Sequence, residues 1–120
     1  MRPHEKLEVW ETSVDLVVEV HKETEAFPKE ERFGLTSQIR RAAVSVPANI
    51  AEGAGRQSSR EFANFLSNAQ GSSSELASEL LIARRLGYLR EEPYLHMRSR
   101  LERVGWMIVG LPRHIKLQKP

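Results

Sequence analysis

The chain contains no cysteine and no long apolar run, and these two absences exclude several classes of protein. Without cysteine it has no disulfide framework, no zinc–thiolate site and no cysteine nucleophile. No uninterrupted apolar stretch approaches the ~20 residues of a membrane span, and the N-terminal MRPHEKLEVWETS has no apolar core of the secretory type. We therefore expect a soluble, cytoplasmic protein that does not enter the membrane, with residues 1–120 forming one domain.

The sequence also has little excess charge of either sign, with 18 Lys+Arg against 16 Asp+Glu. A net charge of +2 does not by itself indicate a nucleic-acid partner. The distribution is uneven, because residues 1–31 hold four basic and nine acidic side chains whereas residues 84–120 hold nine and three. Two interpretations fit this pattern. An acidic first helix lies beside a basic last helix and the charges compensate within the fold, or the arginine-rich end forms a phosphate-binding surface.

Apolar residues recur at steps of three and four in four segments, and no segment shows the period-two alternation of a strand. Each apolar stripe is expected to face the core. The stripes are Leu7, Trp10, Val14, Val17 and His21; Leu35, Ile39, Ala42, Val46, Ile50 and Gly53; Phe62, Phe65, Ala69, Leu76, Leu80 and Ala83; and Tyr94, Met97, Leu101, Val104, Ile108, Leu111 and Ile115. Four helices joined by short loops favour an all-α fold, an up-down-up-down antiparallel four-helix bundle with frayed tails at about 1–6 and 117–120.

A proline lies in the interior of the second helical segment. Pro47 removes one backbone donor and crowds the carbonyl of Ala43, which costs about 3 kcal/mol and bends a helix. Because the apolar stripe keeps its phase on both sides of the proline, the sequence predicts one helix kinked at Pro47 rather than two helices. Ser45 and Asn49 lie beside the kink, and we expect them to bond backbone groups that Pro47 frees or to reach a neighbouring helix.

Charged residues around this segment have no place in an apolar core. They are Arg40, Arg41, Glu52 and Arg56. Adjacent residues differ by about 100° around a helix, so Arg40 and Arg41 cannot face the same way and at least one must flank the apolar stripe. A charge placed there needs a partner, either Glu52 of the same chain or a carboxylate or phosphate from outside. We expect at least two of the three arginines to lie at a subunit interface or to line a shared axial surface.

The arrangements typical of enzymes do not occur in this sequence. GAGR lacks the Gly-Lys-Ser/Thr ending of a phosphate-binding loop, and we expect Gly53 and Gly55 to end the helix with a left-handed residue instead. The four histidines are scattered, with no Glu-x-x-His pair of the di-iron bundle type. The serines at 72–74 have no histidine or lysine nearby to activate them. We therefore expect no catalytic residue, no metal, no cofactor and no enzymatic activity.

Two stretches carry a resemblance to a known family. FPKEERFGLTSQIRRAAVSVPANIAEGAGR, followed by NAQGSSSELASELLIARRLGYL, resembles the four-helix-bundle proteins encoded within intervening sequences of bacterial 23S rRNA genes, which are related to accessory proteins of diversity-generating retroelements. The resemblance implies a ring-like homopentamer without catalytic activity and, in the retroelement branch, a basic protein that binds nucleic acid and a reverse transcriptase. The positions that it reaches are Arg40, Arg41, Ser45, Pro47, Asn49, Glu52, Gly53, Arg56, Gly71, Ser72 and Glu75.

The first functional hypothesis is a non-enzymatic oligomer that binds RNA or DNA. A ring repeats Arg40, Arg41 and Arg56 around its axis, so a weak phosphate contact gains avidity. Trp10, Tyr94 and the phenylalanines fall on the apolar stripes, and we interpret them as core rather than as platforms on which bases stack. Phosphate contacts are therefore expected to dominate any binding of nucleic acid.

The alternative hypothesis is a structural or protein–protein interaction module without nucleic-acid binding, whose partner is another copy or another protein. In that case the arginines pair with acidic residues of the same or a neighbouring subunit, namely Glu52, Glu75 or Glu79. An exposed second apolar surface would favour this hypothesis. Three valines lie off the main stripes and are candidates for such a surface: Val18, Val20 and Val44.

Overall fold

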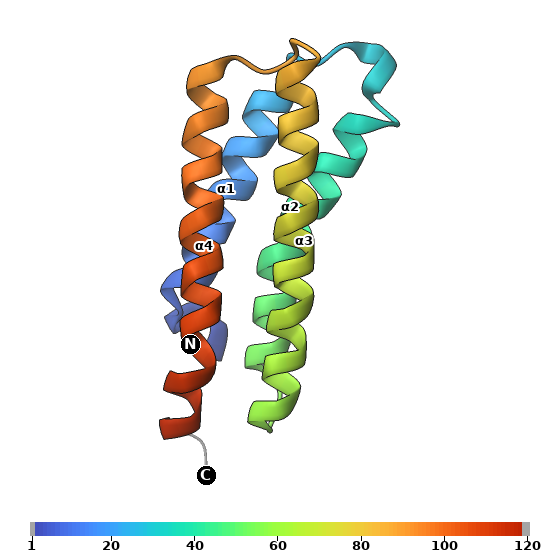
Figure 1. Ribbon diagram of the computed structural model, residues 1–120. Coiled ribbons are helices and arrows are strands. Elements are labelled where there is room, and N and C mark those ends of the chain that lie inside the picture. The colour runs from blue at the N-terminus through green and yellow to red at the C-terminus, as the bar shows by residue number, and fades with distance from the viewer. Residues whose placement is uncertain (1, 119–120) are drawn as a thin grey trace.

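The structure, a computed structural model, describes residues 2–118 and the side chains of residues 2–111. The described chain is all-α, as the sequence predicts, with four long helices, two short 3-10 helices and no strand. The elements are η1 (Pro3–Lys6), α1 (Glu8–Thr24), η2 (Lys29–Glu31), α2 (Leu35–Ala54), α3 (Ser59–Arg85) and α4 (Glu91–Gln118). The long helices lie alongside one another in an elongated molecule of 50 × 24 × 23 Å (Figure 1).

Each long helix packs on the next in chain order, and α4 returns to pack on α1. The most extensive packing joins α2 to α3, and a glycine makes it possible. A Cβ atom at Gly53 would stand 2.6 Å from the Cβ of Phe65 and 3.0 Å from Cδ1 of Phe62, so only glycine lets the two helices approach this closely. The expected left-handed end of α2 is wrong, because Gly55 has a φ of −81°. Within the described chain, Gly87 alone has positive φ, at 83°.

The core consists of two clusters stacked along the molecule, and each takes side chains from all four long helices. Representative members are Leu16, Ile39, Leu76 and Met97 in one cluster and Val9, Ile50, Leu66 and Val104 in the other. The stripes predicted for α2, α3 and α4 supply these clusters, and their described members are buried or half-buried. The side chain of Ile115, the last member of the fourth stripe, lies outside the described residues.

The predicted core face of α1 is wrong by about one residue around the helix. The buried face is Val9, Ser13, Leu16, Val20 and Thr24, whereas the predicted stripe from Leu7 to Val17 is half-buried on the flank and His21 is exposed. Two polar residues made the true face hard to recognise. Ser13 Oγ donates to the carbonyl of Trp10 at 2.7 Å, and Thr24 Oγ1 donates to the carbonyl of Val20 at 2.8 Å. Because these bonds satisfy the hydroxyls within the helix, burying them costs little.

Helix α2 runs without interruption through Pro47, as predicted, and Pro47 itself is buried. Both polar neighbours form hydrogen bonds. Asn49 Nδ2 donates to the carbonyl of Ser45 at 2.8 Å and lies 3.0 Å from Ser45 Oγ. The Ser45 hydroxyl is also 2.8 Å from the Ser72 hydroxyl of α3. The Asn49 amide therefore donates to the carbonyl of Ser45. It does not replace the bond to the carbonyl of Ala43, which is missing because Pro47 has no N–H.

The N-terminal residues that were expected to fray include η1, and His4 packs edge-on against Trp10 with ring centroids 4.8 Å apart. Met1 and residues 119–120 lie outside the described part. The aromatic residues that the sequence assigns to the core, namely Trp10, Tyr94 and the phenylalanines, are buried or half-buried with one exception. Phe33 is wrong, because its ring is 89% exposed in the turn before α2 and is covered only on one side by the Arg32 guanidinium. Among the described helices, none has both the length and the apolar content needed to span a membrane.

Candidate interaction surfaces

Part of the charge asymmetry of the sequence is neutralised where α1 meets α4. Glu8 pairs with Arg103, and Glu19 accepts hydrogen bonds from Arg100 at 3.2 Å and lies 2.6 Å from His96 Nδ1. These pairs favour the interpretation in which acidic and basic helices compensate within the fold. They also engage arginines that a phosphate-binding surface on α4 would need. Arg113, another basic residue of this end, has a side chain outside the described residues.

Arg40 donates hydrogen bonds to the C-terminal end of α1. Its Nε donates to Thr24 Oγ1 at 2.9 Å and one terminal nitrogen donates to the carbonyl of His21 at 3.2 Å. The last carbonyls of a helix lack intrahelical donors and carry partial negative charge, so a guanidinium is stabilising there. The half-buried flank position predicted for one of the two adjacent arginines thus belongs to Arg40, and its partner is a helix end rather than Glu52.

Arg56 and Glu52 lie together, whereas Arg41 stands apart. The Arg56 guanidinium is 3.0 Å from Glu52 Oε1 and 4.8 Å from the centre of the Phe65 ring. Both members of this pair are about half exposed, so it contributes a few tenths of a kcal/mol. Arg41 is exposed and forms no hydrogen bond or ion pair with any described residue. The placement of two arginines at a subunit interface stays a prediction.

A carboxyl pair on α3, Glu75 and Glu79, follows Ser72 by three and seven residues and so shares the face of the helix on which Ser72 contacts α2. Glu75 is exposed, but Glu79, one turn later, is 7% exposed and its Oε1 atom is buried without a hydrogen-bond partner. Burial, and then the charge and hydrogen bond of Glu75, raise the pKa of the Glu79 carboxyl to about 7. No arginine of the described chain pairs with either carboxyl. Gly71, nearby on α3, is exposed, and a Cβ there would meet nothing within 4 Å.

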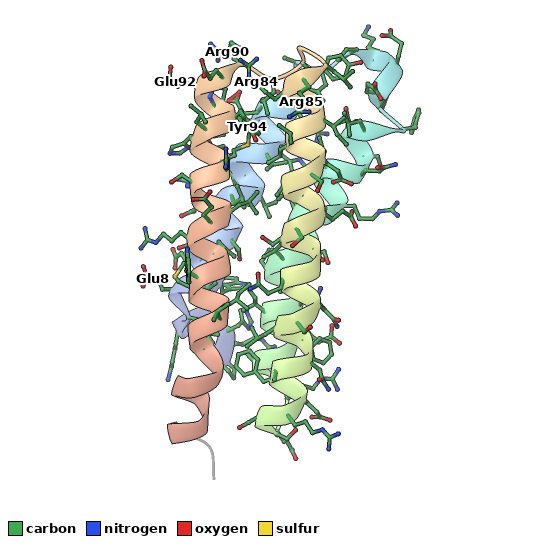
Figure 2. The ribbon with its side chains drawn as sticks, in the orientation of Figure 1. Glu8, Arg84, Arg85, Arg90, Glu92 and Tyr94 are labelled. Atoms are coloured by element: carbon green, nitrogen blue, oxygen red, sulfur yellow. The ribbon has the colours of Figure 1, made fainter. Side chains whose placement is uncertain are left out.

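A groove of about 410 Å³ runs between α3 and α4. Its floor is apolar and includes Leu80, Leu81 and Leu101, and Tyr94 lies in it with its side chain between the two helices (Figure 2). Arg85 of α3 and Arg98 of α4 stand on opposite walls. Arg98 lies 3.5 Å from Glu102 of its own helix, whereas Arg85 has no ion pair among the described residues.

The outer face of α4 exposes large apolar side chains. Leu95 is 49% exposed, Trp106 77% and Val109 61%. These residues fall within one side of the helix, since they are 11 and 3 residues apart. Sequence reasoning did not assign them a role, although their position off the core stripe of α4 was available as a signal. Of the three off-stripe valines, Val18 and Val44 are exposed as expected, but Val20 is fully buried in the core.

Comparison with known proteins identifies the family. The family model described as "23S rRNA-intervening sequence protein" matches residues 5–110. The chain belongs to this family. The resemblance seen in the sequence is therefore confirmed, and a solved member of a similar group shares the fold. This is the crystal structure of a protein with unknown function from the S23 ribosomal protein family of Bacteroides thetaiotaomicron, 23% identical, with a TM-score of 0.79.

That match covers 87% of this intervening-sequence protein and 97% of the Bacteroides chain. A search of curated proteins gave no match. Within the part of the chain that the structure describes, no three histidine, aspartate or glutamate side chains come close enough together to hold a metal ion. The exposed features that the structure offers include the groove, the outer face of α4 and the exposed arginines.

Proposed function

We propose that this intervening-sequence protein is a non-enzymatic, self-assembling interaction module of the cytoplasm, whose surfaces join copies of the chain into a closed homo-oligomer. The outer face of α4 carries the proposal, because the large apolar side chains of Leu95, Trp106 and Val109 stand exposed on it. Burying one large apolar side chain contributes about 1.5–3 kcal/mol, and tryptophan is among the residue types enriched at interface hot spots. The pentameric stoichiometry that we propose comes from the family resemblance alone.

Light scattering coupled to gel filtration at micromolar concentration tests the assembly. We expect the wild-type mass to be a multiple of the 13.7 kDa chain and the Trp106→Ser variant to shift toward the monomer. Phe33→Ser is the matched control, because it removes an even more exposed aromatic ring from another part of the surface. A wild-type monomer would refute the assembly. A dimer would refute the pentamer, and an unchanged Trp106→Ser mass would refute the role of this face.

The proposal includes an up-down-up-down antiparallel four-helix bundle with α2 kinked at Pro47. The contacts between α2 and α3 support their antiparallel arrangement. Gly53, late in α2, faces Phe65, early in α3, whereas the earlier Ser45 bonds the later Ser72. The ion pairs between α1 and α4 follow the same reversed order. The missing donor at Pro47 supports the kink. Such a bundle offers rigid helix faces on which assembly surfaces keep their shape.

Binding of RNA or DNA is the second candidate function, and unpaired arginines favour it. Arg41 is exposed on α2, while Arg85 and Arg90 are exposed where α3 ends and α4 begins (Figure 2). None of these three has an ion pair among the described residues. A ring would repeat them in every subunit, so that several weak phosphate contacts act together.

Titration of short RNA and DNA duplexes at two salt concentrations tests this candidate. Phosphate neutralisation predicts binding that weakens steeply with salt, and the slope should fall when Arg41 and Arg90, which lie outside the groove between α3 and α4, are changed to alanine. Arg56→Ala is the control, because Arg56 is already paired with Glu52. Absence of binding at low salt would eliminate nucleic acid as a partner and leave the interaction module.

A further inference from the structure

We propose that the groove between α3 and α4 receives the outer face of α1 from a second copy of the chain, so that subunits join head to tail. This inference rests on the self-assembly proposed above and adds which two surfaces meet. The pairing is inferred because the apolar and charged groups of the groove between α3 and α4 complement those on the outer face of α1.

The groove offers an apolar floor between two positive walls. Leu80, Leu81 and Leu101 form the floor, and Leu81 is 37% exposed. Arg85 on the α3 wall has no ion pair with any described residue. Arg98 on the α4 wall has only Glu102, in a pair whose side chains are 59% and 64% exposed. Such an exposed pair is weak, so the Arg98 guanidinium can exchange Glu102 for a carboxylate that is shielded from water.

The outer face of α1 offers the complementary pattern, an apolar side chain among carboxylates. Glu11, Asp15 and Val18 are spaced by four and three residues, so they share one face, and all three are exposed. Neither carboxylate pairs with a described residue, in contrast to Glu8 and Glu19, which face α4 and are paired. The face continues to Lys22 and Glu25 and remains negative in sum.

Charge decides between this arrangement and symmetric ones. Packing one groove on a second groove would bring Arg85 and Arg98 against their own copies, and packing α1 on α1 would bring Glu11 and Asp15 together. Like charges placed opposite each other at an interface cost several kcal/mol. Only the packing of α1 on the groove places the two arginines opposite carboxylates and brings Val18 to the apolar floor. A contact between two different patches repeats from subunit to subunit and closes into a ring when the rotation permits.

Charge reversal on each surface, followed by its combination, tests the pairing. The groove variant is Arg85→Glu with Arg98→Glu, and the α1 variant is Glu11→Lys with Asp15→Lys. We expect each alone to raise the dissociation constant of assembly at least tenfold, measured by light scattering over a dilution series at low salt. The chain carrying all four changes should recover assembly, because the reversed charges again match. Arg60→Glu, an exposed and unpaired arginine on another part of α3, is the matched control.

The outcomes separate this inference from the function on which it rests. Unchanged assembly in either double variant would overturn the head-to-tail pairing, as would failure of the combined chain to recover. Circular dichroism checks that each variant keeps its helices, which we expect because all four residues are exposed. If Trp106→Ser dissociates the oligomer while the reversals do not, self-assembly stands and the inferred pairing is wrong. A wild-type monomer would remove both.

Discussion

Replacing Glu79 with glutamine should change how the stability of the protein depends on pH. The Glu79 carboxyl is buried beside Glu75, and its pKa is raised from 4.5 to about 7. The folded state therefore binds a proton more tightly than the unfolded state does. Below pH 4.5 both states are protonated, and stability is greatest with respect to this group. As the pH rises from about 4.5 to 7, the unfolded state ionises freely while the folded state resists, so stability falls.

The size of the effect follows from the shift in pKa. Each unit corresponds to 1.36 kcal/mol, so a rise from 4.5 to about 7 represents a loss of about 3 kcal/mol across this pH window. The Glu79→Gln variant keeps the shape of the side chain and carries no charge at any pH. Its free energy of unfolding should therefore lack this decline, and at pH 8 it should exceed that of the wild type.

Urea unfolding at several pH values, at one fixed protein concentration, measures this difference. Glu30→Gln is a suitable control for the loss of one carboxylate, because Glu30 is exposed in η2. Glu75→Gln should move the wild-type decline to lower pH, since it removes the neighbouring charge that raises the pKa of Glu79. The reasoning fails if the difference in unfolding free energy between wild type and Glu79→Gln is constant from pH 4 to 8.

Two further substitutions probe the packing and the helix ends. Gly53→Ala should destabilise the protein by about 1–3 kcal/mol in urea or thermal unfolding, because its Cβ would overlap Phe65; an unchanged midpoint would mean that α2 and α3 separate at no cost. Arg40→Ala should cost about 1–2 kcal/mol by removing the donors at the end of α1, whereas Arg41→Ala should change stability by less than about 0.5 kcal/mol; equal losses would contradict the different environments of the two arginines.

The sequence was informative where local pattern and tertiary role agree. The stripes of α2, α3 and α4 are long and dominated by apolar residues, so their core faces were predictable. In α1 two overlapping sets of residues compete, and the correct one includes Ser13 and Thr24, whose hydroxyls are satisfied inside the helix. A hydropathy pattern counts such residues against burial, and only the helix geometry shows that their polarity is already neutralised.

Candidate sites were harder to predict than the fold, because they depend on which helices become neighbours. The pairing of Arg56 with Glu52 is local, one helical turn apart, and could be anticipated. The partners of Arg40 lie 16 and 19 residues away at the end of α1, and no local spacing encodes that contact. The groove could not be predicted from either helix alone, because α3 supplies one wall with Arg85 and α4 supplies the other with Arg98. The sequence places Gly53 correctly on the buried stripe, but it could not show that Phe65 of α3, rather than the end of α2, requires a glycine there.

The ion pairs between α1 and α4 bear on the order in which the chain folds. They join residues 77 to 95 positions apart, so they cannot form until α4 has been made. Helices α2 and α3, in contrast, are separated only by residues 55–58 and close a short loop. A helical hairpin of α2 and α3 can thus form early, whereas the acidic α1 can pair with the basic α4 only later. Added salt should therefore slow the docking of α1 on α4 more than the formation of the α2–α3 hairpin. Dissolved ions screen the attraction between oppositely charged segments and so shorten the distance over which it acts.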